Sequence, residues 1–298
     1  MKPVLTPFLI VFGFVSCVKE VTLDFRDYQP HLVVNSLLVP DSMMKVNISK
    51  SICSDKEEVF PPVTDAMVEI SDGKNVLKLV NRGDGNYAIP VQPVSGGNYA
   101  LKVISGDGIT MTASTDISFP LNIRLTPIVE DNYVQVTILD NPAEKNFYWV
   151  GKRSYHVSEK KFIYESYIES NFLLFDDFNR TWSEDRFMRK TYSYHFYARL
   201  SDLSFNGKQA DFRIPVYWIQ RENNPHDNFR QYLYIINADK HLDQYMKAAL
   251  VQYELGVIGD MPVFHTPINM YSNIKNGKGI FGSYTIRQFD ITYPEGLP

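Results

Sequence analysis

A chain of 298 residues with 44% hydrophobic and 21% charged residues has the composition of a globular protein, which excludes a disordered chain. Its formal net charge of −4, without tracts of Lys or Arg, offers no basic surface to nucleic acid. The aromatic fraction of 14% favours a β-rich protein, because aromatic side chains pack well on pleated sheets.

The N-terminus has the pattern of a lipoprotein signal peptide. Lys2 supplies a positive charge, Val4–Val15 is an apolar stretch too short to span a bilayer as a helix, and the small residue Ser16 precedes Cys17. We expect residues 1–16 to be removed and Cys17 to carry lipid, which would anchor the protein to a membrane. Bacterial lipoproteins usually have an aliphatic residue where this chain has a phenylalanine at position 14. The alternatives are an uncleaved membrane-facing helix and an ordinary signal peptide that contains a cysteine.

Residues 17–30 are expected to form a tether to the first folded domain. From residue 31 onwards, short segments with strand signals recur at intervals of about 8 to 12 residues, with Asp-Gly turns between several of them. Lys45–Ser49 is a clear example. The neighbouring segments Ala66–Ile70 and Val76–Val80 have the pattern of a hairpin. This spacing predicts an immunoglobulin-like β-sandwich over residues 31–118.

A second domain is predicted after Phe119-Pro120, because strands rarely continue through a proline. Tyr133–Ile138 alternates between apolar and polar residues, as strands do. One helix is predicted over Asp239–Gln252, where Asp239 can cap the first turn and apolar residues fall on one stripe. The fold is therefore predicted to be mainly β, with a second antiparallel β-sandwich over residues 119–298 that carries one helix near the C-terminus.

Few residues have the pattern of a catalytic, metal or cofactor site. Once Cys17 is acylated, Cys53 has no cysteine to pair with, and we expect it to be a structural thiol at a strand end rather than a nucleophile. The six histidines form no metal-binding motif, and no Gly-x-Ser-x-Gly elbow is present. We therefore predict no metal, no cofactor and no enzymatic activity.

An acidic group of residues supports the main alternative, an enzyme. Clustered carboxylates could hydrolyse glycosidic bonds or hold calcium, although a solvated acidic loop is commoner. The residues concerned are Asp176, Asp177, Glu184 and Asp185.

The same part of the sequence is rich in aromatic residues and has neither a strand nor a helix period. Aromatic side chains that are exposed concentrate binding energy at interfaces, so this stretch is a candidate docking loop, although most of its rings are expected in the core. The predicted interface residues are Phe172, Phe175, Phe178, Trp182 and Phe187.

The C-terminal region contains a glycine-rich motif. Asn276-Gly277-Lys278-Gly279 can form a tight turn in which the two glycines permit positive φ, and Ile280 and Phe281 can enter the core. A phosphate-binding cradle is the alternative, but it needs a following helix, whereas Ser283–Arg287 has the pattern of a strand.

This motif, with Tyr271-Ser272-Asn273-Ile274 before it, resembles the surface-lipoprotein family of Bacteroidota known as domain-of-unknown-function family 4249. The resemblance covers nearly the whole chain. Other segments that match in order are Leu32–Asn35, Val63–Gly73, Gly85–Tyr87, Gly97–Leu101 and Leu203–Gly207.

Three functions follow from these observations. The resemblance implies a lipid-anchored protein of the outer membrane, at the cell surface, that partners a TonB-dependent receptor and assists nutrient capture or uptake. The alternatives are an envelope hydrolase acting on glycans or peptides, which rests on the acidic and aromatic residues, and a structural lipoprotein of envelope assembly.

Overall fold

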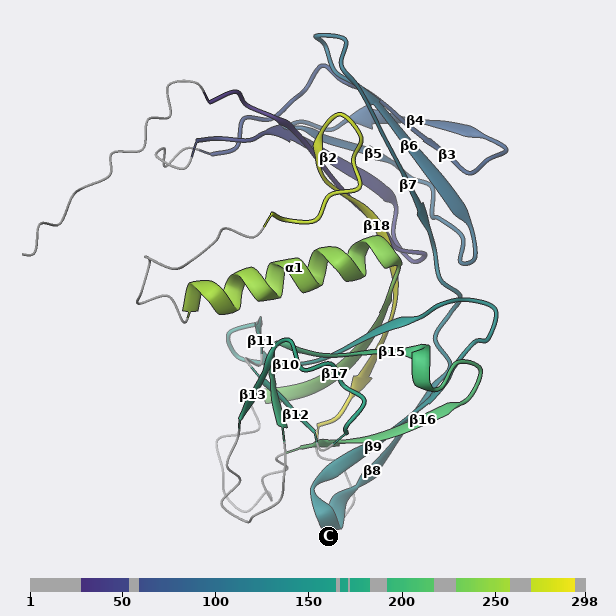
Figure 1. The fold of residues 1–298 in the computed structure, drawn as a ribbon, viewed down its shortest axis with the longest axis vertical. Coiled ribbons are helices and arrows are strands. Elements are labelled where there is room, and N and C mark those ends of the chain that lie inside the picture. Colours follow the sequence, from purple (N-terminus) through teal and green to yellow (C-terminus); the bar gives the residue numbers. More distant parts are fainter. Residues whose placement is uncertain are drawn as a thin grey trace, which may run out of the picture.

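The computed structural model describes residues 28–53, 59–164, 167–170, 172–182, 192–216, 229–257 and 269–292. In this part of the chain the protein is mainly β, with several antiparallel sheets and one α-helix near the C-terminus, which confirms these predictions (Figure 1). The signal peptide, Cys17 and most of the tether lie outside the described residues. None of the described helices has the length and apolar character needed to cross a membrane.

The N-terminal strands form consecutive antiparallel neighbours in the order β1-β2-β5-β4-β3-β6-β7. Their inward side chains alternate with outward ones; in β6, for example, Tyr99, Leu101 and Val103 are buried. These side chains and others from the same strands form the N-terminal core, which also includes Ile274 and Phe281. The strands are β1 (Leu32–Leu38), β2 (Met44–Lys50), β3 (Met67–Ser71), β4 (Val76–Asn81), β5 (Asn86–Ile89), β6 (Asn98–Ile104) and β7 (Thr110–Asp116).

The later strands form a second core, the C-terminal core, in which Val136, Val150, Phe212 and Ile235 are buried. They make two three-stranded sheets, β16-β9-β8 and β12-β14-β13, and the run β11-β10-β17-β18, with β15 also paired to β10. The strands are β8 (Ile123–Ile128), β9 (Tyr133–Leu139), β10 (Phe147–His156), β11 (Lys161–Tyr164), β12 (Tyr167–Ser170), β13 (Arg180–Trp182), β14 (Tyr192–His195), β15 (Tyr197–Ser201), β16 (Gln209–Pro215), β17 (Phe229–Ala238) and β18 (Lys278–Asp290). Short 3-10 turns occupy Val129–Asp131 and Asp202–Ser204.

Strand β18 joins the two sets of strands. Its first half, Lys278–Ser283, pairs in parallel with β1, and its second half, Tyr284–Asp290, pairs antiparallel with β17. Figure 1 shows this strand running from the N-terminal strands past the helix to the later ones. The N-terminal strands therefore share a sheet with residues more than two hundred positions later, a pairing that the strand spacing did not predict. The domain boundary at residue 119 and the immunoglobulin-like arrangement stay predictions.

Helix α1 (Lys240–Val257) lies against the sheet formed by β10, β17 and β18. Its Leu242 and Leu250 pack with Trp149 and Ala238, and this small cluster is separate from the two larger cores. Asp239 begins the helix, as predicted: its Oδ1 accepts a hydrogen bond from the backbone N–H of Leu242 at 2.8 Å.

Candidate functional site

Of the aromatic rings predicted to form an interface, those of Phe172, Phe175 and Phe178 are described, and they pack mostly inward. Phe175 is 3% exposed, and its ring centroid lies 5.5 Å from that of Tyr194 and 5.1 Å from that of Phe212, so this ring belongs to the core rather than to the surface. Phe172 is half-buried beside Phe175, and Phe178 contacts the ring of Trp149 beneath α1. For Trp182 only the backbone, at the end of β13, is described, and Phe187 lies outside the described residues.

The surface of this segment is instead formed by two leucines that were not among the predicted interface residues. Leu173 is 76% exposed and Leu174 45% exposed, because they occupy a turn whose flanking Phe172 and Phe175 face the core. With Phe172 they form one wall of a groove of about 590 Å³, and β9 and β16 supply the remaining lining residues, Gln135, Asp211, Phe212 and Arg213. We call this the leucine groove.

The sequence contains only a weak signal for these leucines. Phe172-Leu-Leu-Phe175 is a short apolar run, and such a run occurs in fully buried segments as well as in exposed turns. Which of its side chains are exposed could not be read from the sequence, because the segment has no regular period.

The carboxylates of the predicted acidic site are engaged in ion pairs. Asp176 accepts a charged hydrogen bond from Arg199 Nη1, and its Oδ2 lies 3.5 Å from Lys247 Nζ. Asp177 is exposed, with its Oδ2 3.7 Å from Arg180 Nη2. Glu184 and Asp185 lie outside the described residues. Within the part of the chain that is described, no group of three His, Cys, Asp or Glu side chains could hold a metal ion.

Arg199 is the centre of this ion-pair network. Its Nε and Nη2 contact the two carboxylate oxygens of Asp243 at 2.6 and 2.7 Å, and Trp149 Nε1 donates to Asp243 at 3.0 Å. Burial opposes the charge of Arg199, but the hydrogen bonds and charge of Asp243 outweigh it and raise the pKa of Arg199. The network holds α1 against the sheet, so we assign it a structural role.

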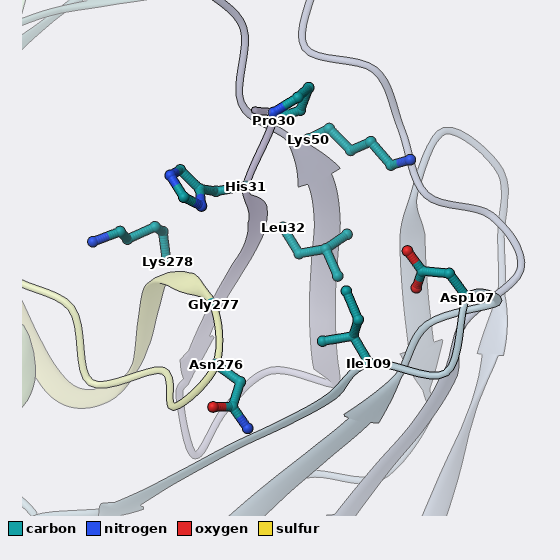
Figure 2. A pocket seen from close by; sticks show the side chains of 9 residues that line it. All are labelled: Pro30, His31, Leu32, Lys50, Asp107, Ile109, Asn276, Gly277 and Lys278. Carbon is teal, nitrogen blue, oxygen red and sulfur yellow. The ribbon is translucent and has the colours of Figure 1, made fainter. Parts of the chain in front are cut away.

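A second cavity, of about 430 Å³, lies where the described chain begins (Figure 2). Several elements that are distant in sequence form its wall: the residues before β1, the end of β2, the turn between β6 and β7, and the start of β18. Figure 2 shows His31 and Lys278 on one side of Leu32 and Ile109, and Lys50 and Asp107 on the other. The lining residues are Pro30, His31, Leu32, Lys50, Asp107, Ile109, Asn276, Gly277 and Lys278, and we call this site the entry pocket.

The glycine-rich motif forms one wall of the entry pocket. Asn276 has φ +60°, and its Nδ2 donates to the carbonyl of Thr110 at 3.1 Å. Lys275 and Thr112 exchange backbone hydrogen bonds of 2.9 and 3.4 Å, which fix the turn to β7. Positive φ thus occurs at Asn276 and Gly279, and not at Gly277. The residues that follow form β18 and not a helix, as predicted, so the turn lacks the helix N-terminus of a phosphate cradle.

The family model described as "Domain of unknown function (DUF4249)" matches residues 18–290. The chain belongs to this family. No curated protein matches this DUF4249 chain by sequence.

Solved structures give only distant similarities to this DUF4249 protein. A DUF4785 family protein from Legionella pneumophila is 13% identical, with a TM-score of 0.26, over 68% of this chain and 52% of that one. The alpha-2-macroglobulin of Salmonella is 12% identical, with a TM-score of 0.23, over 72% of this chain and 14% of that one. The chain therefore spans about half the length of the first protein and a small part of the second. At these TM-scores the alignments carry no argument about fold or function.

Proposed function

We propose that this DUF4249 protein is an outer-membrane lipoprotein at the cell surface, anchored through Cys17, that partners a TonB-dependent receptor and assists nutrient capture or uptake. The observation that carries the proposal is the exposed pair Leu173 and Leu174 at the leucine groove. In this proposal the N-terminal strands form an immunoglobulin-like sandwich, which is supported by their alternating burial.

The leucine groove has the composition of a protein-binding surface. Its centre is apolar, formed by Phe172, Leu173 and Leu174, and its rim carries the charges of Asp211 and Arg213. An apolar centre with a polar rim is typical of interfaces between proteins. The turn that carries the two leucines is anchored by the neighbouring Phe172, whose ring centroid lies 5.2 Å from that of Phe175 in a T-shaped arrangement and 5.3 Å from that of Phe212 in a tilted one. A pre-organised surface loses little conformational entropy when a partner binds.

The rim of the groove is ordered by contacts of its own. Asp211 accepts hydrogen bonds from Thr137 Oγ1 at 2.6 Å and Gln209 Nε2 at 2.5 Å, and the first of these is the main reason why its pKa is lowered. Arg213 lies over the ring of Tyr133, 4.4 Å from its centroid. We expect Asp211 to be ionised at neutral pH, so the rim offers one charge of each sign to a partner.

The test is copurification from detergent-solubilised outer membrane. The native protein should bring down a large β-barrel receptor, and the double variant Leu173→Asp/Leu174→Asp should bring down at least about tenfold less, as expected when a central apolar contact is lost. Leu203→Asp is the matched control, because Leu203 is 78% exposed and lies away from the groove lining.

Two results would contradict the proposal: a native protein that purifies as a clean monomer, or a double variant that retains as much receptor as the control. Palmitate labelling tests the anchor separately, since Cys17→Ser should abolish the label and move the protein out of the membrane fraction.

A further inference from the structure

The entry pocket lies beside two of the most exposed apolar side chains of the described chain. Val59 is 89% exposed and Phe60 59% exposed. Their position next to the pocket follows from the backbone, because the N–H of Lys50 donates to the carbonyl of Pro61 at 2.8 Å and Ser49 pairs with Pro62. One end of the N-terminal strands therefore combines exposed apolar groups with a pocket.

The charges around this pocket are mostly positive, although the chain as a whole is acidic. Lys50 and Lys278 are exposed at its rim, beside the imidazole of His31, and Asp107 is the one acid among its lining residues. Asp107 is held by a hydrogen bond from Ser105, which is the first cause of its lowered pKa; the charge of Lys50 contributes in the same direction. Within the part of the chain that is described, the side chain of Lys278 has no hydrogen-bond or ion-pair partner, so its ammonium group is available to a ligand.

The short distance in sequence between Cys17 and the entry pocket limits how far the pocket can lie from the membrane. Pro30 lines the pocket, and the segment from Cys17 to Pro30 spans at most about 45 Å even when fully extended. If Cys17 is acylated, as the proposed function requires, this end of the fold is the part of the described chain that the anchor holds within about 45 Å of the lipid surface.

We propose that this end of the molecule rests on the membrane and that the entry pocket binds the phosphate of an anionic lipid headgroup. The rim lysines attract anionic lipid, and the apolar floor of Leu32 and Ile109 contacts the carbon atoms that follow the phosphate. Phe60 enters the interface between headgroups and acyl chains, where aromatic rings are favoured. This binding uses side-chain cations and not the amides of a helix N-terminus.

The test is vesicle flotation of the full chain carrying Cys17→Ser, which has no acyl group. Vesicles of phosphatidylcholine mixed with phosphatidylglycerol should bind it more tightly than phosphatidylcholine alone, and high salt should reduce the difference. The variant Lys50→Gln/Lys278→Gln should bind the mixed vesicles roughly 25-fold more weakly, because each lysine near an anionic surface contributes about fivefold. Adding Phe60→Ser should lower binding further.

The matched control is Lys208→Gln/Lys240→Gln, which removes the same charge from exposed lysines outside the pocket. Because every variant keeps the same apolar leader, differences between them report the pocket. Equal loss in the control, no preference for anionic lipid, or tight binding of free glycerol phosphate without vesicle binding would overturn the proposal. Failure of the proposed anchor would give a different result: the native protein would take up no palmitate label, while the Cys17→Ser protein would still bind vesicles.

Discussion

Thr115 donates a hydrogen bond from Oγ1 to Asp239 Oδ2 at 2.7 Å, across 124 positions of the chain, and both residues are buried. The Oδ1 atom of Asp239 accepts the backbone N–H groups of Leu242 at 2.8 Å and Ser283 at 3.2 Å. One carboxylate thus connects β7, the first turn of α1 and β18. Burial raises the pKa of Asp239, and the three hydrogen bonds act in the opposite direction.

Replacing Thr115 with valine should lower the free energy of unfolding by about 1–3 kcal/mol, because the buried oxygen of Asp239 loses its donor. Thr112→Val, on the same strand at a half-buried site, should cost no more than about 0.5 kcal/mol. Urea denaturation measures both values. Equal costs would show that the Thr115 hydrogen bond does not stabilise the junction.

Arg199→Met should be strongly destabilising, by about 3–5 kcal/mol, because it leaves the buried carboxylate of Asp243 without its positively charged partner. The double variant Arg199→Met/Asp243→Leu should cost less than the sum of the two single variants, since it leaves no unpaired charge. Arg82→Met, at an exposed site, serves as the control. Additive losses in the double variant would contradict the ion-pair coupling.

Glu144 should make stability depend on pH. Burial raises the pKa of its carboxyl above 4.5, while the hydrogen bond from Asn146 acts against this change. Because the folded-state pKa is the higher one, the contribution of Glu144 is present below about pH 4.5 and is lost as the pH rises through the folded-state pKa.

Glu144→Gln retains an acceptor for the backbone N–H of Phe119 but has no ionisable group. Its stability relative to the native protein should therefore rise between about pH 4.5 and pH 8. Thermal denaturation across this range measures the effect. The exposed Glu130→Gln is the control, and a Glu144→Gln profile parallel to that of the native protein would contradict the prediction.

Gly279→Ala should disrupt the pairing of β1 with β18. The glycine has φ +108°, and a Cβ would lie 2.1 Å from the carbonyl oxygen of Val34, so we expect a loss of more than about 3 kcal/mol. Gly73 also has positive φ, at +83°, but a Cβ there meets no atom within 4 Å. Gly73→Ala should therefore cost only the backbone strain, roughly 1–2 kcal/mol, in the same chemical denaturation experiment.

Similar losses of stability at the two glycines would show that backbone strain, and not the contact with Val34, determines the cost of Gly279→Ala. This comparison separates the two effects because both glycines have positive φ, while only Gly279 has an atom in the way of a Cβ.

Much of the local structure could be predicted from the sequence. Alternation identified Lys45–Ser49 within β2 and Tyr133–Ile138 within β9, and the capping residue Asp239 located the start of α1. These features depend on neighbours within a few positions, so a local pattern contains the information that specifies them.

The candidate sites could be predicted only in part. The segment from Phe172 onwards was identified as a surface candidate, but its exposed side chains are Leu173 and Leu174, while Phe175 lies in the core. A stretch without a period gives no rule for which side chains face inward, because packing against Phe212 and Tyr194 decides it. The entry pocket could not be predicted, since its lining residues come from four separate segments that lie between Pro30 and Lys278 in the sequence.

Composition, period and turn residues were thus enough to establish a β-rich chain with one capped helix and a glycine-rich turn followed by a strand. The position of that last strand, parallel to β1 and antiparallel to β17, was decided by tertiary structure alone. The reason is physical: a strand can hydrogen-bond to any edge that its pleat fits, and the choice depends on which core buries Phe281 and which carbonyl approaches Gly279. Those contacts join residues far apart in the chain, so they exist only once the chain has folded.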